Sequence, residues 1–211
     1  MPQKSTSKSR TFKPCNKGKA VGQKQPLTPE QVQLIKKSLE AGEEWRDLVL
    51  FSTAIDTMLR SIDLLRLKVD NVCDEEGKIV EEFTVLQQKT GDGTLVGLSD
   101  FTREKLDKWI RMSHKFPEDY LFTVLKGDRL KPLSRDYYRE LVKKWVRYAR
   151  LDPKMYSTHS LRRTKAALIY DRTRNIEVVR ELLGQKTVTA TSAYLNVGKK
   201  KALAIARRFE I

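Results

Sequence analysis

The last quarter of the chain is its most constraining feature, because charged and polar residues stand there in sequence that otherwise favours helices. His159 and Arg162 are three residues apart within His159–Thr164. Tyr194 follows at the end of a segment rich in Thr, Ser and Ala, after Leu183-Gly184-Gln185. Basic side chains that hold a phosphate, with a phenol that attacks it, would account for this combination.

Composition limits the class of protein. A chain of 211 residues with 39% hydrophobic residues predicts one domain with a tail. The formal net charge of +15 favours a polyanionic partner, nucleic acid ahead of an acidic membrane. The two cysteines form no CxxC pair, which fits a reducing, intracellular setting. No apolar run approaches the roughly 18–20 residues of a membrane span, and the N-terminus lacks an apolar signal core, so we expect a cytoplasmic protein.

The chain divides into a basic arm and one domain. Residues 1–26 contain Lys and Arg but no acid, and we expect a disordered arm that either aids solubility or lies along a DNA backbone. Residues 27–211 are the expected domain. Thr28, Pro29 and Gln31 predict a capped helix that runs to about residue 41.

The remaining pattern predicts an α+β fold that is mostly helical. Apolar spacing indicates a core helix from about residue 43, and residues 79–86 and 94–98 read as two strands of one small antiparallel hairpin. Turn-forming residues 89–94 connect these strands. Further helices are expected at 100–114, from Ser134 onward, and at 160–171, 176–183, 189–196 and 199–209.

The residues supply the side chains for phosphodiester cleavage without a metal. Such chemistry needs a nucleophile, positive charge on the phosphate oxygens and an acid for the leaving oxygen. Candidate metal ligands are sparse: His114 and His159 are far apart in sequence and no acidic cluster has two-metal spacing, so a metal nuclease is disfavoured and no cofactor is expected. We expect Arg60 to end an apolar helix, where composition alone favours an ion pair with Asp56 or Asp63 over a site.

The motif order resembles the catalytic domain of the tyrosine recombinases, the lambda-integrase family. Leu59–Leu64 matches the family pattern Leu-Arg-x-x-Glu-Leu, with aspartate for glutamate. Lys89 stands in the predicted hairpin, and Lys78 or Lys68 are weaker matches for that lysine. His159–Thr164 matches His-x-Leu-Arg-[His/Arg]-Thr, and a tyrosine follows Leu-Gly-Gln nine residues on. The likeness covers roughly residues 28–197.

The resemblance implies a role for each matched residue. Tyr194 would attack the scissile phosphate and form a 3′-phosphotyrosyl link, while Arg60 and Arg162 would hold the non-bridging oxygens. Lys89 would protonate the 5′ oxygen, and His159 would transfer a proton or hydrogen-bond the phosphate. Further residues implied are Asp63, which would orient an arginine, and Arg163, Lys165 and Lys186, which would contact DNA.

Two departures from the family pattern bear on activity. Gln185 stands where most relatives have histidine; its amide can donate a hydrogen bond to a phosphate but cannot transfer a proton at neutral pH. Only about 27 residues precede the matched domain, so we expect the N-terminal domain that closes around DNA in many relatives to be lacking. The chain would then be a naturally minimal recombinase, a fragment, or a protein that needs accessory factors, and the basic arm would partly substitute through salt-dependent phosphate contacts.

The resemblance also implies partners. We expect a site-specific recombinase of the integrase, resolvase or invertase type that needs neither metal nor ATP. It would act on double-stranded DNA as a tetramer on paired sites, with accessory DNA-bending proteins, in a bacterial or phage-encoded, nucleoid-associated setting. Residues 199–209 would pack on their own domain or on a neighbouring protomer. Two alternatives stay open: relaxation of DNA like a type IB topoisomerase, and a catalytically weak relative that only binds DNA.

Overall fold

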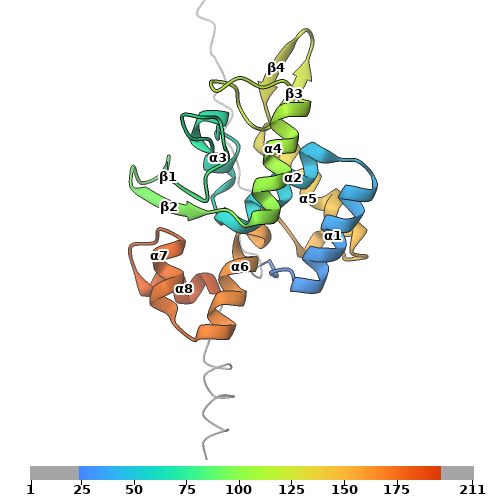
Figure 1. The fold of residues 1–211 in the computed structure, drawn as a ribbon. Coiled ribbons are helices and arrows are strands. Elements are labelled where there is room, and N and C mark those ends of the chain that lie inside the picture. Colours follow the sequence, from blue (N-terminus) through green and yellow to red (C-terminus); the bar gives the residue numbers. More distant parts are fainter. Residues whose placement is uncertain (1–23, 196–211) are drawn as a thin grey trace, which may run out of the picture.

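A computed structural model describes residues 24–195 as a mainly helical fold with two short antiparallel hairpins (Figure 1). The α-helices are α1 Pro29–Ala41, α2 Trp45–Thr57, α3 Ser61–Leu64, α4 Asp100–Met112, α5 Arg135–Tyr148, α6 Thr158–Thr173, α7 Ile176–Leu182 and α8 Val188–Leu195. The strands are β1 Glu82–Leu86, β2 Gly93–Gly97, β3 Thr123–Lys126 and β4 Arg129–Pro132, and the 3-10 turns are η1 Val69–Asn71 and η2 Pro153–Met155. The predicted fold class is confirmed.

Side chains that cap the helices define where they begin. Thr28 Oγ1 accepts from the Gln31 amide at 3.3 Å, and Gln31 Oε1 accepts from the Thr28 amide at 2.9 Å. This reciprocal pair is the capping box predicted for α1, and it satisfies two amides that a helix start leaves unpaired. Ser99 and Ser134 cap α4 and α5 in the same way with their hydroxyl groups.

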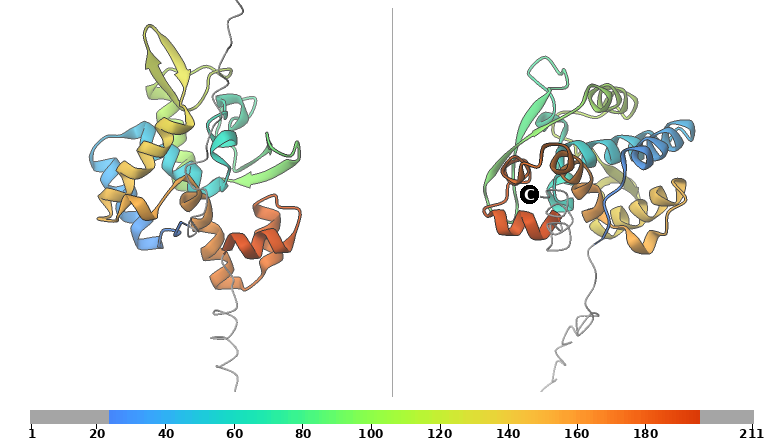
Figure 2. Two further views of the ribbon diagram at one scale, coloured as in Figure 1. Left: turned by 180° about the vertical axis from the view of Figure 1, so that it is seen from behind. Right: turned by 90° about the horizontal axis from the view of Figure 1, so that it is seen from below.

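Helix α2 is the centre of the main core. Every residue from Asp47 to Thr57 is buried, so other elements enclose this helix on all sides. Its buried polar residues are Asp47, Ser52, Thr53, Asp56 and Thr57. It contacts α1, α4 and α6, and the view from below in Figure 2 shows helices around it.

A second, smaller core lies at the C-terminal end and involves the predicted nucleophile. Helix α6 connects the two cores, because Leu161 packs in the first and Ala166 in the second. Val179 and Leu183 of the α7 segment complete the small core together with Leu195 of α8. Helices α7 and α8 pack on α6, seen in orange and red in Figures 1 and 2, and Tyr194 rests against this core.

The prediction of a single small sheet was wrong. The hairpin β1–β2 occurs as expected, with Phe83 opposite Val96, but β3 and β4 form a second hairpin. Its paired residues Leu125 and Leu130 are 67% and 61% exposed. Because every position of β4 faces solvent, its sequence carries no alternation of buried and exposed residues, the signal on which strand prediction depends.

The expected position of Arg60 at the end of a helix was also wrong. Helix α2 ends at Thr57, and Met58 adopts a left-handed conformation with φ of 49°. The chain reverses there, so that Arg60 becomes the N-cap residue of the short helix α3. A left-handed backbone at a residue other than Gly or Asn is uncommon and needs surrounding structure to hold it.

The ends of the predicted arm and domain lie largely outside the described residues. This applies to residues 1–23 and to the expected helix at 199–209. The segment Lys24–Leu27, however, lies on the body: the Gln25 amide donates to the Met155 carbonyl at 3.2 Å and the Leu27 amide to Thr164 Oγ1 at 3.0 Å.

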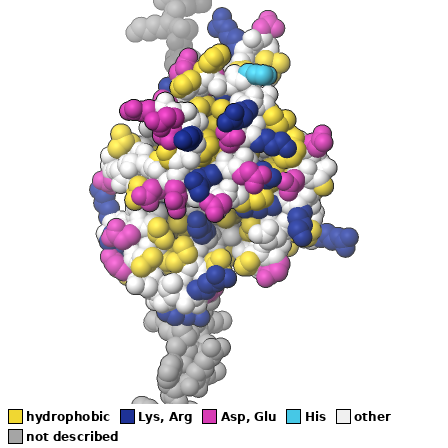
Figure 3. All heavy atoms as spheres, viewed as in Figure 1, with side chains coloured by type: hydrophobic (Ala, Val, Ile, Leu, Met, Phe, Trp, Pro, Cys, Tyr) yellow, Lys and Arg dark blue, Asp and Glu magenta, His cyan; other side chains and the backbone are white. Residues whose placement is uncertain are grey.

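The surface viewed in Figure 3 carries acidic and basic side chains side by side, so this face is not a basic patch. Across residues 24–195, every helix is too short or too polar to cross a membrane.

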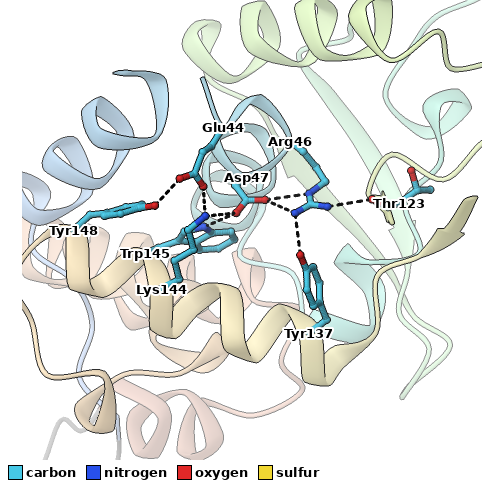
Figure 4. A network of polar contacts seen from close by, with 8 residues as sticks. All are labelled: Glu44, Arg46, Asp47, Thr123, Tyr137, Lys144, Trp145 and Tyr148. Carbon is cyan, nitrogen blue, oxygen red and sulfur yellow. Dashed lines mark hydrogen bonds and ion pairs between the residues drawn. The ribbon is translucent and has the colours of Figure 1, made fainter. Parts of the chain in front are cut away.

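A buried carboxylate fastens the start of α2 to α5 (Figure 4). Asp47 is 3% exposed, and its Oδ2 accepts from Trp145 Nε1 at 3.0 Å. Its Oδ1 accepts from Arg46 Nη2 at 2.8 Å, and Lys144 Nζ lies 3.9 Å from Oδ2. A buried charge of this kind is stable only while its partners remain.

We therefore expect Asp47→Ala to lower the free energy of unfolding by about 3 kcal/mol, because it leaves the Trp145 N–H and the Arg46 charge without their partner. Asp136→Ala is the matched control, since that carboxylate is exposed and pairs with Arg139 on the same helix; it should cost under about 1 kcal/mol. Urea unfolding followed by tryptophan fluorescence measures both. Equal losses would contradict the assigned role of Asp47.

Candidate active site

Five of the predicted catalytic residues line one open groove of about 570 Å³. They come from distant parts of the sequence, and a further arginine joins them: Arg60, Lys89, His159, Arg162, Tyr194 and Arg135. A larger cavity of about 820 Å³ lies beside the Asp47 network, and none of the predicted site residues lines it. The groove is therefore distinguished from the larger cavity by the predicted site residues that line it, not by its volume.

Arg60 lines the groove and has no acidic partner in the part of the chain that the structure describes. Its Nη1 donates to the side-chain oxygen of Gln87, so the predicted ion pair with Asp56 or Asp63 was wrong. Asp56 instead accepts from the Ser99 amide at 2.9 Å and the Ser99 hydroxyl at 2.6 Å, which joins α2 to α4.

The hairpin that carries Lys89 is anchored at its base. Asp63, which is 3% exposed, accepts from the Gln88 amide at 2.9 Å through Oδ1. Gln87 is 2% exposed and its amide reaches both Thr94 and Arg60. Asp63 therefore holds the lysine-bearing loop by a direct bond, whereas its effect on an arginine is through charge alone: it favours the protonated form of Arg162.

Arg162 is the most deeply placed charge of the groove. It is 5% exposed, and its Nη2 donates to the Leu183 carbonyl at 2.8 Å, which ties the end of α7 to α6. Burial lowers the pKa of Arg162, because a charged group loses hydration there. Helix α8 follows this turn and packs on α6 and α7, and its Tyr194 lines the groove.

His159 lies in the first turn of α6 and lines the groove, where its ring is partly shielded from solvent. Burial of its ring lowers its pKa below the ordinary 6.5, and the positive charges of Arg162, Arg163 and Arg60 lower it further. The imidazole is consequently neutral at pH 7 and can accept a proton.

Tyr194 presents a buried phenol to these cations. Its hydroxyl has no hydrogen-bond partner among residues 24–195; Arg162 lies near, but without ordinary hydrogen-bond geometry. Burial raises the pKa of Tyr194 to about 12, against the opposing charges of Arg162 and Arg163. The phenol is therefore protonated at neutral pH and must lose its proton before it can act as a nucleophile.

The groove is short of negative charge. Within the described range, Arg60 donates to the Gln87 side-chain amide and Arg162 to the Leu183 carbonyl, and neither forms an ion pair with an acid. Converging cations that lack a counter-charge form a binding site for an anion. Within the same range, no three His, Cys, Asp or Glu side chains gather into a possible metal site.

The other predicted site residues lie outside the groove lining. Gln185 Oε1 accepts from Thr191 Oγ1 at 2.7 Å, which connects it to α8. Lys186 is 72% exposed, 3.3 Å from an Asp92 oxygen. Arg163 and Lys165, which the sequence assigns to DNA, turn to protein partners: Arg163 to the Lys24 carbonyl and Lys165 to the Asp56 carbonyl.

Two residues of the site were not predicted from the sequence. Arg135 lines the groove from the first position of α5, directly after its cap Ser134. Gln87 supports Arg60 from the hairpin. The position of Arg135 after a helix cap was readable in the sequence, but nothing local to Gln87 indicates that its amide meets an arginine 27 residues away.

The sequence profile of the phage integrase family matches residues 25–201. The chain belongs to this family. It is 28% identical over 172 residues to a tyrosine recombinase of Pseudothermotoga lettingae, covering 81% of this chain and 56% of that protein. It is 30% identical over 177 residues to tyrosine recombinase XerA of Saccharolobus solfataricus, covering 84% and 54%. The chain thus spans about half the length of the curated relatives it matches.

Solved structures share the fold at lower identity. The XerH site-specific recombinase bound to palindromic difH substrate, in a post-cleavage complex, gives a TM-score of 0.67 at 22% identity, over 86% of this chain and 52% of that one. The XerA recombinase gives 0.68 at 17% identity, over 88% and 66%. These likenesses establish that the fold is that of a tyrosine recombinase catalytic domain.

Gly184 offers a test of how closely the α7–α8 turn packs on the Lys89 hairpin. Its φ is +56°, and a Cβ there would collide with the side chains of Gln87 and Thr94. We expect Gly184→Ala to destabilise the protein by about 2 kcal/mol or more, through strain and collision together. Thermal unfolding measures the loss.

Gly77→Ala is the matched control for Gly184→Ala. It also has a positive φ, +76°, but has no atom within 4 Å of the added Cβ. The control should show only the cost of the left-handed backbone, about 1 kcal/mol. If the two variants lose the same stability, the hairpin and the turn are not in close contact.

Proposed function

We propose that the protein is a site-specific DNA recombinase that cleaves and rejoins DNA through a 3′-phosphotyrosyl intermediate. The observation that carries the proposal is that, among residues 24–195, Arg60 and Arg162 have no acidic partner and lie beside a Tyr194 hydroxyl that has no hydrogen-bond partner. Membership of the phage integrase family and the many matches to tyrosine recombinases support it.

The arginines act on the phosphate that the nucleophile attacks. Tyr194 Oη bonds to the scissile phosphorus, and the bond from phosphorus to the 5′ oxygen breaks. Arg60 and Arg162 hold the non-bridging oxygens as negative charge builds on them, at fixed positions that need no reorganisation. The covalent link keeps the bond energy, so that a 5′ hydroxyl can reverse the step without ATP or a metal ion.

Two side chains handle the protons. His159 accepts the phenol proton, since its lowered pKa leaves it neutral at pH 7. Lys89 donates a proton to the departing 5′ oxygen from its exposed place on the hairpin, where it can reach bound DNA. Arg135, at the edge of the groove, would contact the DNA backbone beside the scissile phosphate.

Gln185 serves the site by position and by a hydrogen bond. Its Oε1 is occupied by Thr191, which leaves the amide nitrogen as the end that donates to a phosphate oxygen. Lys186 extends the phosphate contacts at the surface. Asp63 contributes through the hairpin that it holds.

The larger assembly follows from the same proposal. We infer a tetramer on two paired DNA sites, with accessory DNA-bending proteins, in the cytoplasm of a bacterium on its nucleoid or from a phage-encoded gene. Several solved relatives are bound to DNA, among them XerH on difH substrate and a lambda integrase dimer on a COC′ core site. Metal and cofactor independence belongs to the proposal as well.

The two other functions predict different behaviour. A type IB topoisomerase would relax a supercoiled plasmid that lacks any specific site, and the curated matches are to recombinases and integrases. A relative that only binds DNA would lack part of the catalytic set, whereas the groove contains Arg60, Lys89, His159, Arg162 and Tyr194 together.

The decisive variant is Tyr194→Phe. The target site is first found by trapping covalent protein–DNA complexes from the host genome with denaturant and sequencing the attached strands. On a nicked suicide substrate made from that site, the wild type should form a denaturant-resistant adduct and Tyr194→Phe should form none, because phenylalanine lacks the attacking oxygen. Denaturing gels and mass spectrometry of the modified peptide measure this.

Tyr170→Phe is the matched control, a second tyrosine packed against the same small core. It should keep the adduct. The proposal fails if the wild type forms no adduct on its trapped site, or if Tyr194→Phe forms as much as the wild type.

A further inference from the structure

Arg163 is a buried charge that the cleavage mechanism does not use. It is 6% exposed, and its guanidinium carbon lies 5.6 Å from the centre of the Tyr194 ring. Its Nη1 donates to the Lys24 carbonyl at 2.5 Å, while its buried Nε has no partner within the described residues. A DNA contact needs a side chain that reaches solvent, and this one is enclosed.

The contact with Tyr194 restrains the nucleophile. An arginine over an aromatic face is attracted by the electron-rich ring, and the attraction grows when water is excluded. Arg162 also lies near Tyr194, but side chains of consecutive helix residues point in different directions. Arg162 therefore lines the groove and donates to the Leu183 carbonyl, whereas Arg163 contacts the face of the Tyr194 ring.

The contact with Lys24 joins the tyrosine to the chain that enters the domain. The segment Lys24–Leu27 is fastened at two more points: the Gln25 amide donates to Met155, and the buried Leu27 donates to Thr164 through its amide. The Lys24 carbonyl is thus a fixed acceptor, and it sets where the Arg163 fork can lie.

We propose that Arg163 is a positioning residue for Tyr194 and that the entering segment Lys24–Leu27 holds Arg163 in place. The effect on cleavage rests on the proposed function. The contacts that join Lys24–Leu27 to Arg163 and Arg163 to Tyr194 do not depend on that function. Whatever displaces the entering segment releases Arg163 and loosens the nucleophile. The chain that precedes the domain can in this way influence cleavage without touching the scissile phosphate.

The linkage can be read without DNA. 3-Fluorotyrosine replaces the seven tyrosines of the full chain, and the ¹⁹F resonance lost in Tyr194→Phe is that of Tyr194. Arg163→Met should shift this resonance, because the charge over the ring is gone. Gln25→Pro should shift it too, since proline removes the amide that fastens the segment to Met155, whereas Gln25→Ala keeps that amide and should not. Arg111→Met, at an exposed arginine of α4, should leave it unchanged.

Cleavage and binding then separate positioning from DNA contact. On the trapped site, Arg163→Met should slow single-turnover adduct formation by about 10²-fold, the scale expected when a reacting group is misplaced. The dissociation constant for DNA and its salt dependence should stay as in wild type. A phosphate contact would instead weaken binding and reduce the salt slope by about one.

If Arg163→Met does not fold, the conservative variant Arg163→Lys provides the same test. Arg163→Lys keeps a charge but lacks the fork, so it should fold, shift the resonance less and recover part of the rate. The proposal is overturned if neither Arg163 variant moves the Tyr194 resonance, if Gln25→Pro leaves it in place, or if binding falls with the rate per bound complex unchanged. If the wild type forms no adduct, the proposed function fails while the resonance still decides the linkage.

Discussion

The burial of Arg162 is the constraint on which the rest of the site depends. A guanidinium that is 5% exposed must find partners, and the only strong one that it has within residues 24–195 is the Leu183 carbonyl at 2.8 Å. That bond joins the end of α7 to α6, beside the small core against which Tyr194 packs. The charge itself stays unneutralised, and its lowered pKa shows the cost of burial. A bound phosphate would supply the missing charge.

Two hydrophobic cores of different size hold the groove residues in place. The main core around α2 fixes Arg60 through the left-handed turn at Met58, while the small core holds the tyrosine. Met58 packs in the small core, and so the turn that precedes Arg60 also contacts the unit that carries Tyr194, the proposed nucleophile. The Lys89 hairpin is fastened to the first core by Asp63 and packs against the α7–α8 turn at Gly184.

Local sequence predicted the elements whose signals are local. The capping box at Thr28, the core helix α2 and the hairpin around Lys89 were all readable, because caps, apolar spacing and turn residues act over a few positions. The exposed hairpin β3–β4 was not readable, since solvent-facing strands leave no alternating pattern.

The order of the motifs predicted the proposed catalytic residues. It did not predict the residues that hold their side chains in place. The Gln87–Arg60 bond and the contact of Arg163 with Lys24 join positions far apart in sequence. Such pairings depend on tertiary packing, which local sequence patterns do not indicate. The same limit explains why the burial of Arg163 and its bond to the Lys24 carbonyl could not be predicted from its place next to Arg162.

We infer that one phosphate binds between the arginines and the phenol. A structure of the protein with vanadate and the two strand ends of its target DNA would test this, because vanadate adopts the five-coordinate geometry of phosphoryl transfer. We expect vanadium to be bonded to Tyr194 Oη, with its equatorial oxygens facing Arg60 and Arg162. Vanadium bound elsewhere, or bound in the groove with Tyr194 turned away from it, would show that these side chains do not act on one phosphate.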